Sequence, residues 1–126
     1  MAVIGVVGLG AMGLGIAQVY AQAGFTVYAT DTQDGARTSA LQRLSNALQP
    51  RVDAGKMASK AMQAILSAIT ITNRPEDFVA PDMVIEAIIE ELAIKQALVA
   101  RLERAFPKAI LATNTSALSV TLLSRG

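Results

Sequence analysis

Short apolar runs alternate with longer segments of helical periodicity along the whole chain. Apolar runs rich in β-branched residues predict buried strands, whereas apolar residues three and four positions apart predict helices. The expected strands are residues 3–7, 26–30, 69–72, 83–87 and 109–112. The expected helices are residues 11–23, 34–49, 59–68 and 90–105, and another is expected at 118–123. This alternation predicts an α/β fold with a parallel, doubly wound sheet.

The chain between the second and third strands is too long for one crossover, so its two helices are expected to form an excursion from the sheet. Gly24 is expected after the C-cap of the first helix, Asp34 as the N-cap of the second, and Pro50 as the end of the second. The apolar stripes expected to face the core are Met12, Ile16, Val19, Tyr20 and Ala23 in the first helix and Leu41, Leu44 and Leu48 in the second.

The turn between the first strand and the first helix reads Gly8-Leu9-Gly10-Ala11-Met12-Gly13. In this G-x-G-x-x-G pattern the first glycine permits a tight turn and the second lets backbone amides approach a pyrophosphate. The third glycine lets the helix pack closely on its strand. Unpaired amides and the dipole at a helix N-terminus favour an anion. The pattern therefore predicts a Rossmann-like fold that binds a dinucleotide.

Asp31 ends the second strand, 18 residues past Gly13. A carboxylate at this place can accept hydrogen bonds from both ribose hydroxyls of an adenosine. It favours NAD over NADP, because a 2′-phosphate would meet the carboxylate. Arg37 lies nearby in the sequence and is interpreted as a surface charge on the next helix.

Further polar residues follow other strands, at the sheet edge where doubly wound folds bind ligands. Residues Asn114-Thr115-Ser116 offer an amide and hydroxyls beside the expected nicotinamide, although the same residue types also suit a helix cap. Glu86 ends the fourth strand, and periodicity does not decide between a structural and a functional role for its carboxylate. Glu91 and Lys95 have the spacing of an ion pair on one helix face.

Composition narrows the class of protein. Hydrophobic residues make up 52% of the 126-residue chain and charged residues 17%, which indicates a folded globular domain. A net charge of +1 without a basic patch argues against nucleic-acid binding. The chain has no cysteine, so it forms no disulfide and no thiolate metal site. Arg51 and Lys56, at the tip of the excursion, are interpreted as solvated side chains that can also attract a phosphate-bearing substrate.

The first charged residue is Asp31, so the chain opens with a long uncharged segment. Six of the first 24 residues are glycine and no basic residue precedes the apolar run. We therefore expect a buried strand and helix here, and neither a signal peptide nor a membrane span. A cytoplasmic location is the expectation that follows.

Three segments in this order resemble the N-terminal domain of the L-3-hydroxyacyl-CoA dehydrogenases, including the bacterial 3-hydroxybutyryl-CoA dehydrogenases. They are residues 6–17, Val84-Ile85-Glu86-Ala87 with Glu90 and Lys95, and Thr113-Asn114-Thr115-Ser116. The resemblance covers essentially the whole chain from Ala2. It implies an oxidoreductase of fatty acid β-oxidation or related acyl-CoA metabolism, which oxidises a 3-hydroxyl to a ketone and passes hydride to NAD.

The resemblance also implies roles for individual residues. Gly8, Leu9, Gly10, Ala11, Met12 and Gly13 would hold the pyrophosphate of NAD, and Asp31 would hold the adenosine ribose. Glu90, Lys95 and Asn114 would lie on the nicotinamide side, and Ser116 would contact the substrate hydroxyl. The family uses a histidine paired with a glutamate as general base, and this chain contains no histidine.

The family's histidine lies past the position at which this sequence ends, and so does the helical second domain that closes over acyl-CoA and forms the family's homodimer. We therefore expect residues 1–126 to be a single, truncated NAD-binding domain that binds NAD without turnover. Its last strand is expected to leave an unpaired sheet edge.

Three alternatives remain open at this stage. One is an enzyme of the 3-hydroxyisobutyrate or 6-phosphogluconate type, although that group carries a glycine-rich segment where this chain has residues 114–116. The second is a gulonate dehydrogenase. The third is a non-catalytic module that senses NAD.

Overall fold

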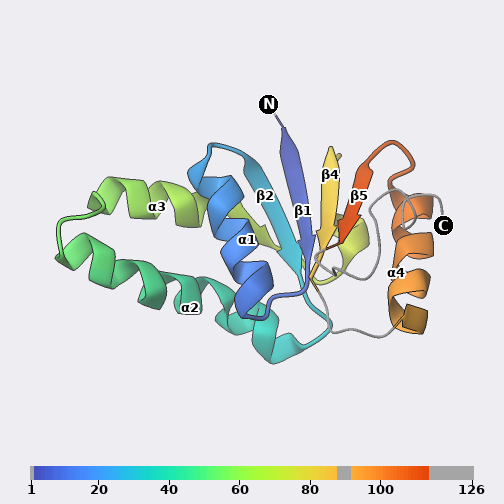
Figure 1. The fold of residues 1–126 in the computed structure, drawn as a ribbon, viewed down its shortest axis with the longest axis horizontal. Coiled ribbons are helices and arrows are strands. Elements are labelled where there is room, and N and C mark those ends of the chain that lie inside the picture. The colour runs from blue at the N-terminus through green and yellow to red at the C-terminus, as the bar shows by residue number, and fades with distance from the viewer. Residues whose placement is uncertain (1, 88–91, 114–126) are drawn as a thin grey trace.

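The computed structural model describes residues 2–87 and 92–113. Five parallel strands form one sheet in the order β3-β2-β1-β4-β5 (Figure 1). In chain order the elements are β1 (Val3–Val7), α1 (Ala11–Gln22), β2 (Thr26–Thr30), α2 (Asp34–Asp53), α3 (Ser59–Ala68), β3 (Ile69–Ile71), the 3₁₀ turn η1 (Pro75–Asp77), β4 (Met83–Glu86), α4 (Leu92–Ala105) and β5 (Ile110–Thr113). The predicted parallel, doubly wound α/β sheet with a two-helix excursion is confirmed.

The strand register brings the carboxyl ends of the central strands to one edge. Val7 of β1 is paired with Thr30 of β2 on one side and with Glu86 of β4 on the other. The residues that follow these strand ends leave the sheet together. From β1 the strand order runs outward to β2 and β3 on one side, and the chain then crosses back to place β4 on the other side of β1. Ligands bind at such a switch in strand order in folds of this kind.

Two hydrophobic clusters cover the two faces of the sheet. Adjacent strand residues point to opposite faces, so Val6 belongs to the cluster packed by α1, α2 and α3, and Val7 to the cluster packed by α4. Phe78, just after η1, packs in the second cluster against β1. A Cβ at Gly5 would lie 2.5 Å from the Phe78 ring, so this strand position has room only for glycine.

Helix α1 buries a face that overlaps only partly with the predicted stripe, of which Ile16 and Tyr20 are partly buried against the core. Its buried residues are Gly13, Leu14, Ala17 and Ala21, whereas Met12 and Val19 are 61% and 64% exposed. The prediction was wrong for these exposed positions because almost every position of α1 is apolar or small, so periodicity does not single out a face. Small residues on the buried face let the helix lie close to the sheet and to α3.

The end of α1 agrees with the prediction for Gly24. Gly24 has a positive φ of 99° and follows the C-cap Ala23. Its N–H donates to the Ala21 carbonyl at 3.1 Å, and the Phe25 N–H donates to the Tyr20 carbonyl at 3.0 Å. The rings of Tyr20 and Phe25 meet edge to face, with centroids 5.4 Å apart. This is a Schellman ending with its hydrophobic contact.

Helix α2 departs from the prediction at both ends. Its N-cap is Gln33, and Asp34 is the first helical residue, where its charge suits the positive end of the helix. Pro50 lies inside the helix, which continues to Asp53. Proline removes only its own N–H and the ring disturbs only the preceding turn. The Ala54 N–H still donates to the Pro50 carbonyl at 3.0 Å, so the last turn forms.

The remaining elements lie close to their expected positions. Helix α3 has the predicted bounds, strands β3 and β4 end one residue earlier than predicted, and strand β5 begins and ends one residue later. Of the α2 stripe, Leu44 and Leu48 are buried and Leu41 is partly buried. Within residues 2–87 and 92–113, no helix has both the length and the apolar character needed to span a bilayer. The helix expected at 118–123 lies outside the described residues.

An ion pair links η1 to α4 on the second face. The Arg101 guanidinium donates two hydrogen bonds to the Glu76 carboxylate, one of them at 2.7 Å from Nη2 to Oε1. These bonds hold the pKa of Glu76 below its usual value and raise the pKa of Arg101. Both side chains are partly exposed, so solvent weakens the attraction between them.

Replacing Glu76 with glutamine is expected to lower the free energy of unfolding at neutral pH by less than about 1 kcal/mol. The carboxylate's contribution is complete above its ordinary pKa of 4.5 and is lost as the pH falls through the lower pKa of the folded state. Urea unfolding of both proteins across this pH range measures the difference, which should shrink on acidification. A difference that stays constant with pH would contradict the ion pair's contribution.

Candidate functional site

The site begins at the turn between β1 and α1. Gly8 has a φ of 111°, a conformation that favours glycine, and its N–H donates to the Thr30 carbonyl at 2.8 Å. This hydrogen bond ties the turn to the end of β2. The Leu9 side chain is fully buried, so the turn is also anchored in the core.

Gly10 is the N-cap of α1 and provides no side-chain cap. The first turn of α1 also contains no acidic residue. The amides of a helix's first turn have no partner within the helix and carry its positive dipole end. A Cβ built on Gly10 meets no atom within 4 Å, so the space over this residue is open. This end of α1 can therefore accept an anion that comes close to the backbone.

Gly13 performs a different task from Gly10. A Cβ at Gly13 would lie 1.7 Å from the Gly8 carbonyl oxygen, far inside van der Waals contact. Only glycine lets α1 approach the turn this closely. The three glycines of the predicted motif therefore have the three structural environments that a dinucleotide-binding turn requires.

Asp31 follows β2 and faces the same turn. Its Oδ2 accepts a hydrogen bond from the Leu9 N–H at 2.7 Å, and its Oδ1 accepts one from the Gln33 N–H at 2.8 Å. Each carboxylate oxygen has a second lone pair. The two amides thus fix the orientation of the carboxylate and leave acceptor capacity on both oxygens, which suits a vicinal diol.

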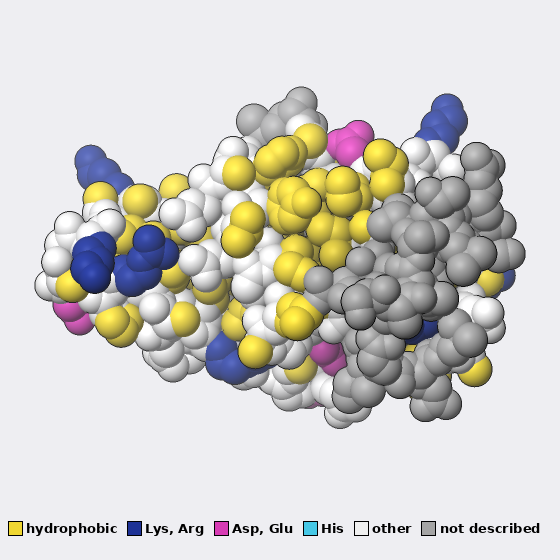
Figure 2. All heavy atoms as spheres, viewed as in Figure 1, with side chains coloured by type: hydrophobic (Ala, Val, Ile, Leu, Met, Phe, Trp, Pro, Cys, Tyr) yellow, Lys and Arg dark blue, Asp and Glu magenta, His cyan; other side chains and the backbone are white. Residues whose placement is uncertain are grey.

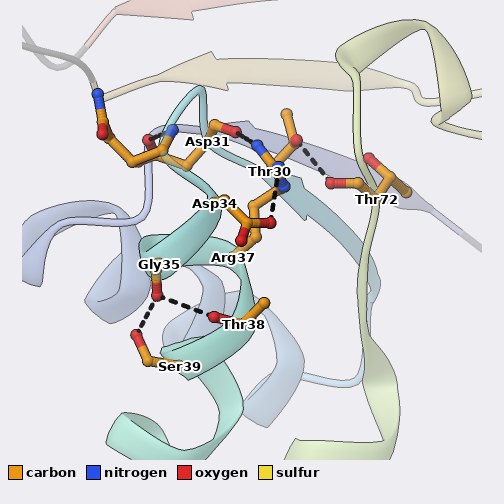
Figure 3. A network of polar contacts seen from close by, with 9 residues as sticks. Thr30, Asp31, Asp34, Gly35, Arg37, Thr38, Ser39 and Thr72 are labelled. Atoms are coloured by element: carbon orange, nitrogen blue, oxygen red, sulfur yellow. Dashed lines mark hydrogen bonds and ion pairs between the residues drawn. The ribbon is translucent and has the colours of Figure 1, made fainter.

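Two neighbouring contacts hold the end of β2 in place (Figure 3). The Thr30 hydroxyl donates to the Thr72 carbonyl at 2.6 Å, which links the ends of β2 and β3. The Arg37 guanidinium donates to the Asp31 carbonyl at 2.6 Å and to the exposed Asp34 carboxylate at 3.1 Å. Arg37 is therefore not the free surface charge that we expected, since its side chain is only 19% exposed.

The glycine turn and the residues that follow β2 line a cavity of about 330 Å³ at the carboxyl edge of the sheet. Its volume lies at the small end of the range found for ligand pockets. The lining consists of Gly8, Gly10, Asp31, Thr32, Gln33, Ala87 and Ile94. Ala87 follows β4, and the exposed Ile94 comes from α4. The cavity combines open amides, a fixed carboxylate and an apolar wall, which are the features that a diphosphate, a ribose and an aromatic base require.

Lys95 lies one residue beyond Ile94 but points into the protein. Its side chain is 2% exposed, and its Nζ donates to both oxygens of the Glu86 carboxylate, at 2.9 and 3.1 Å. The sequence suggested Glu91 as the partner of Lys95, four residues earlier on the same helix. The structure gives Lys95 a partner at the end of β4, and Glu91 lies outside the described residues.

The structure brings some of the predicted site residues together and leaves others untested. Gly8, Gly10 and Asp31 line one cavity, Gly13 lies beneath the turn, and Ala11 and Met12 are exposed at the start of α1. Glu90, Asn114, Thr115 and Ser116 lie outside the described residues, so their predicted roles remain predictions.

One polar contact to the turn was missed by sequence reasoning. The Arg43 guanidinium, on α2, donates to the Leu9 carbonyl at 2.8 Å. Arg43 borders the apolar stripe of α2 beside Leu44 and Ala40, and a cation at the edge of such a stripe is the only signal of this contact in the sequence. A contact across 34 residues of chain cannot be read from helical periodicity.

Comparison with known proteins agrees with this geometry. Residues 3–126 match the family model described as the NAD-binding domain of 3-hydroxyacyl-CoA dehydrogenase. The chain is 36% identical over 119 residues to a 3-hydroxybutyryl-CoA dehydrogenase of Mycobacterium tuberculosis, with 93% of this chain and 42% of that protein covered. It is 39% identical over 117 residues to a probable 3-hydroxybutyryl-CoA dehydrogenase of Bacillus subtilis, with 92% of this chain and 41% of that protein covered.

A solved structure shares the fold. The crystal structure of 3-hydroxybutyryl-CoA dehydrogenase from Escherichia coli K12 superposes with a TM-score of 0.90 at 35% identity, covering 97% of this chain and 26% of that one. The chain thus spans less than half the length of these relatives. It belongs to the 3-hydroxyacyl-CoA dehydrogenase family, of which it represents the NAD-binding domain.

Proposed function

We propose that residues 1–126 form one NAD-binding domain of an enzyme that oxidises the 3-hydroxyl of an L-3-hydroxyacyl-CoA to 3-oxoacyl-CoA. The observation that carries the proposal is the cavity over Gly10, where an uncapped helix end faces open space beside a fixed Asp31 carboxylate. The family match supports both the cofactor and the substrate class. NAD, when bound, supplies the hydride acceptor.

The turn from Gly8 to Gly13 is proposed to hold the pyrophosphate. Leu9 and Gly13 shape the turn from within the core, while Gly10, Ala11 and Met12 present the backbone amides of the helix start. Hydrogen bonds from such amides to phosphate oxygens are charge-assisted and therefore strong. The buried base of the turn keeps these donors in place before the cofactor arrives.

Asp31 is proposed to accept hydrogen bonds from both hydroxyls of the adenosine ribose. Its two amide donors already orient the carboxylate. The same negative charge disfavours a 2′-phosphate, so NAD is the proposed cofactor and NADP the weaker ligand. Ala87 and Ile94 offer an apolar wall for the adenine ring.

Residues on the nicotinamide side are proposed from the family resemblance. Glu90, Lys95 and Asn114 would contact the cofactor there, and Ser116 would contact the substrate hydroxyl. The buried Glu86 carboxylate holds the Lys95 ammonium, so the position of this charge is fixed by the strand that carries Glu86. These 126 residues contain no histidine to act as the family's general base, so we propose that they bind NAD but do not turn over substrate by themselves.

Acyl-CoA carries phosphates, and the outer end of the α2–α3 excursion presents cations to them. Arg51 and Lys56 line a second cavity of about 470 Å³, together with apolar residues such as Met57 and Ile65. Lys and Arg side chains gather at this end in Figure 2, over the turn between α2 and α3. We propose this cationic end as an attraction site for the phosphate groups of the substrate.

We also propose that the enzyme is a cytoplasmic homodimer, formed through a second domain of the family's kind.

Alanine substitutions at three glycines separate packing from cofactor binding. Gly10→Ala should leave the free energy of unfolding within about 0.5 kcal/mol of wild type, because its Cβ enters open space. It should weaken NAD binding at least about tenfold, since that space is the proposed path of the pyrophosphate. Gly13→Ala should lose about 1–3 kcal/mol of stability or more, because its Cβ meets the Gly8 carbonyl.

Gly15→Ala is the matched control within α1. Its Cβ meets nothing within 4 Å, so alanine should stabilise the helix by about 0.5–1 kcal/mol and leave NAD affinity unchanged. Urea unfolding and calorimetric titration with NAD give both quantities. A Gly10→Ala protein that binds NAD as wild type does would show that the pyrophosphate does not pass over this residue.

Asp31→Ala should weaken NAD binding by about 10- to 100-fold, the size expected for lost charge-assisted hydrogen bonds. It should also narrow the preference for NAD over NADP, because the repelling charge is gone. Asp34→Ala is the control, since this carboxylate is 83% exposed and binds Arg37 instead of the turn. Titration with both dinucleotides measures the effect, and tighter wild-type binding of NADP than of NAD would contradict the role of Asp31.

The proposed reaction is tested on the protein at its natural length. NADH absorbance should increase with L-3-hydroxybutyryl-CoA and NAD, and should not increase with the free acids 3-hydroxyisobutyrate or gulonate. A polypeptide of residues 1–126 should bind NAD in calorimetry and produce no NADH. Turnover of the free acids without turnover of the CoA thioester would favour the alternative hydroxy-acid dehydrogenases. NAD binding without turnover of any of these substrates by the natural protein would favour a sensing module.

A further inference from the structure

We infer that Arg43 is a positioning residue for the dinucleotide-binding turn, and that it sets the direction of the peptide group between Leu9 and Gly10. The inference rests on the proposed binding of NAD at this turn. Arg43 reaches the turn from α2, an element that donates no other hydrogen bond to residues 8–10 within the described part of the chain.

The guanidinium of Arg43 is held by three acceptors. Its Nη2 donates to the Leu9 carbonyl at 2.8 Å and to the Ala36 carbonyl at 3.1 Å, and its Nε donates to the Ser39 hydroxyl at 3.0 Å. The two acceptors on α2 fix the planar group before it meets the turn. Arg43 is half-buried, so water competes only partly for these hydrogen bonds.

Leu9 is thereby held at both of its backbone groups. Its N–H donates to the Asp31 carboxylate at 2.7 Å, and its carbonyl accepts from Arg43 at 2.8 Å. Its side chain is fully buried. A residue flanked by Gly8 and Gly10 would otherwise have an unusually free backbone, because glycine populates both signs of φ. The charged contacts from β2 and α2 remove that freedom.

The carbonyl contact has a geometric consequence for the next amide. The described peptide bonds are all trans, and in a trans peptide the C=O and N–H point in opposite directions. When Arg43 holds the Leu9 carbonyl toward α2, the Gly10 N–H must point away from α2. Gly10 lines the cavity at this place, and the space over it is open. The contact therefore orients a donor for the pyrophosphate.

A purely structural role is the competing explanation, because Arg43 also joins α2 to the rest of the domain. The two roles differ in which ligands they affect. Loss of a positioned phosphate donor weakens ligands that carry the pyrophosphate and spares adenosine, which has the ribose alone. A general loosening of the domain weakens adenosine, ADP and NAD together.

The test compares wild type with Arg43→Met and Arg43→Lys by NMR titration with adenosine, ADP and NAD. Arg43→Met should weaken ADP and NAD by about tenfold or more, the loss expected for one misplaced hydrogen bond. Its affinity for adenosine should stay within about twofold. Arg43→Lys should recover part of the loss, because its ammonium can donate to the Leu9 carbonyl without the bridge to Ala36 and Ser39. Amide exchange at Gly10 and Leu9 in the ligand-free protein should be faster in Arg43→Met.

Arg101→Met is the matched control, since it removes a guanidinium contact that joins α4 to η1 on the other face of the sheet. It should leave the affinities for all three ligands unchanged. Equal weakening of adenosine and NAD by Arg43→Met would overturn the inference, and so would unchanged binding of all three. A wild-type chain that binds neither ADP nor NAD would instead contradict the proposed function.

Discussion

The close approach of α1 to the turn after β1 is the constraint on which the site depends. At Gly13 the helix backbone lies so near the Gly8 carbonyl that a single Cβ would fall 1.7 Å from its oxygen. This approach is continued along α1 by Ala17 and Ala21, whose small side chains are buried. It brings the positive end of the helix to the edge where β1, β2 and β4 finish together. The proposed anion-binding end therefore results from packing, without any basic side chain in the turn.

Asp31 couples two tasks that are usually described separately. Its carboxylate orients the turn through the Leu9 amide, and the remaining lone pairs are available to a ribose. In the proposed binding mode, the shape of the phosphate site and the recognition of the sugar therefore depend on one charged group. The Arg43 guanidinium contacts the carbonyl of the same Leu9 residue whose N–H donates to Asp31.

The sequence was sufficient to predict the sheet, its parallel strands and the glycine turn, because these follow from local signals such as apolar runs and the spacing of glycines. The sequence was insufficient where several different structures are compatible with the same local pattern of residues. Helix α1 is apolar or small at almost every position, so its buried face is decided by which positions are small enough to approach the sheet. Proline ends many helices, yet helix α2 continues past Pro50 and tolerates one missing hydrogen bond near its end. The partners of Lys95 and Arg43 lie on other elements, and only the tertiary structure brings them together.

The buried pair of Glu86 and Lys95 shows how the second face of the sheet contributes to the site. Removing two charges from water costs free energy that their attraction only partly offsets, so such a pair is weak evidence for stability by itself. Its geometric effect is definite. The bidentate contact at 2.9 and 3.1 Å fixes the rotation of α4 about its axis, since Lys95 must face the end of β4. Successive helical residues are rotated by about 100°, so Ile94 is turned away from Glu86 and toward the cavity that it lines. The ion pair thus places an apolar side chain in the cavity that the fixed carboxylate of Asp31 also lines.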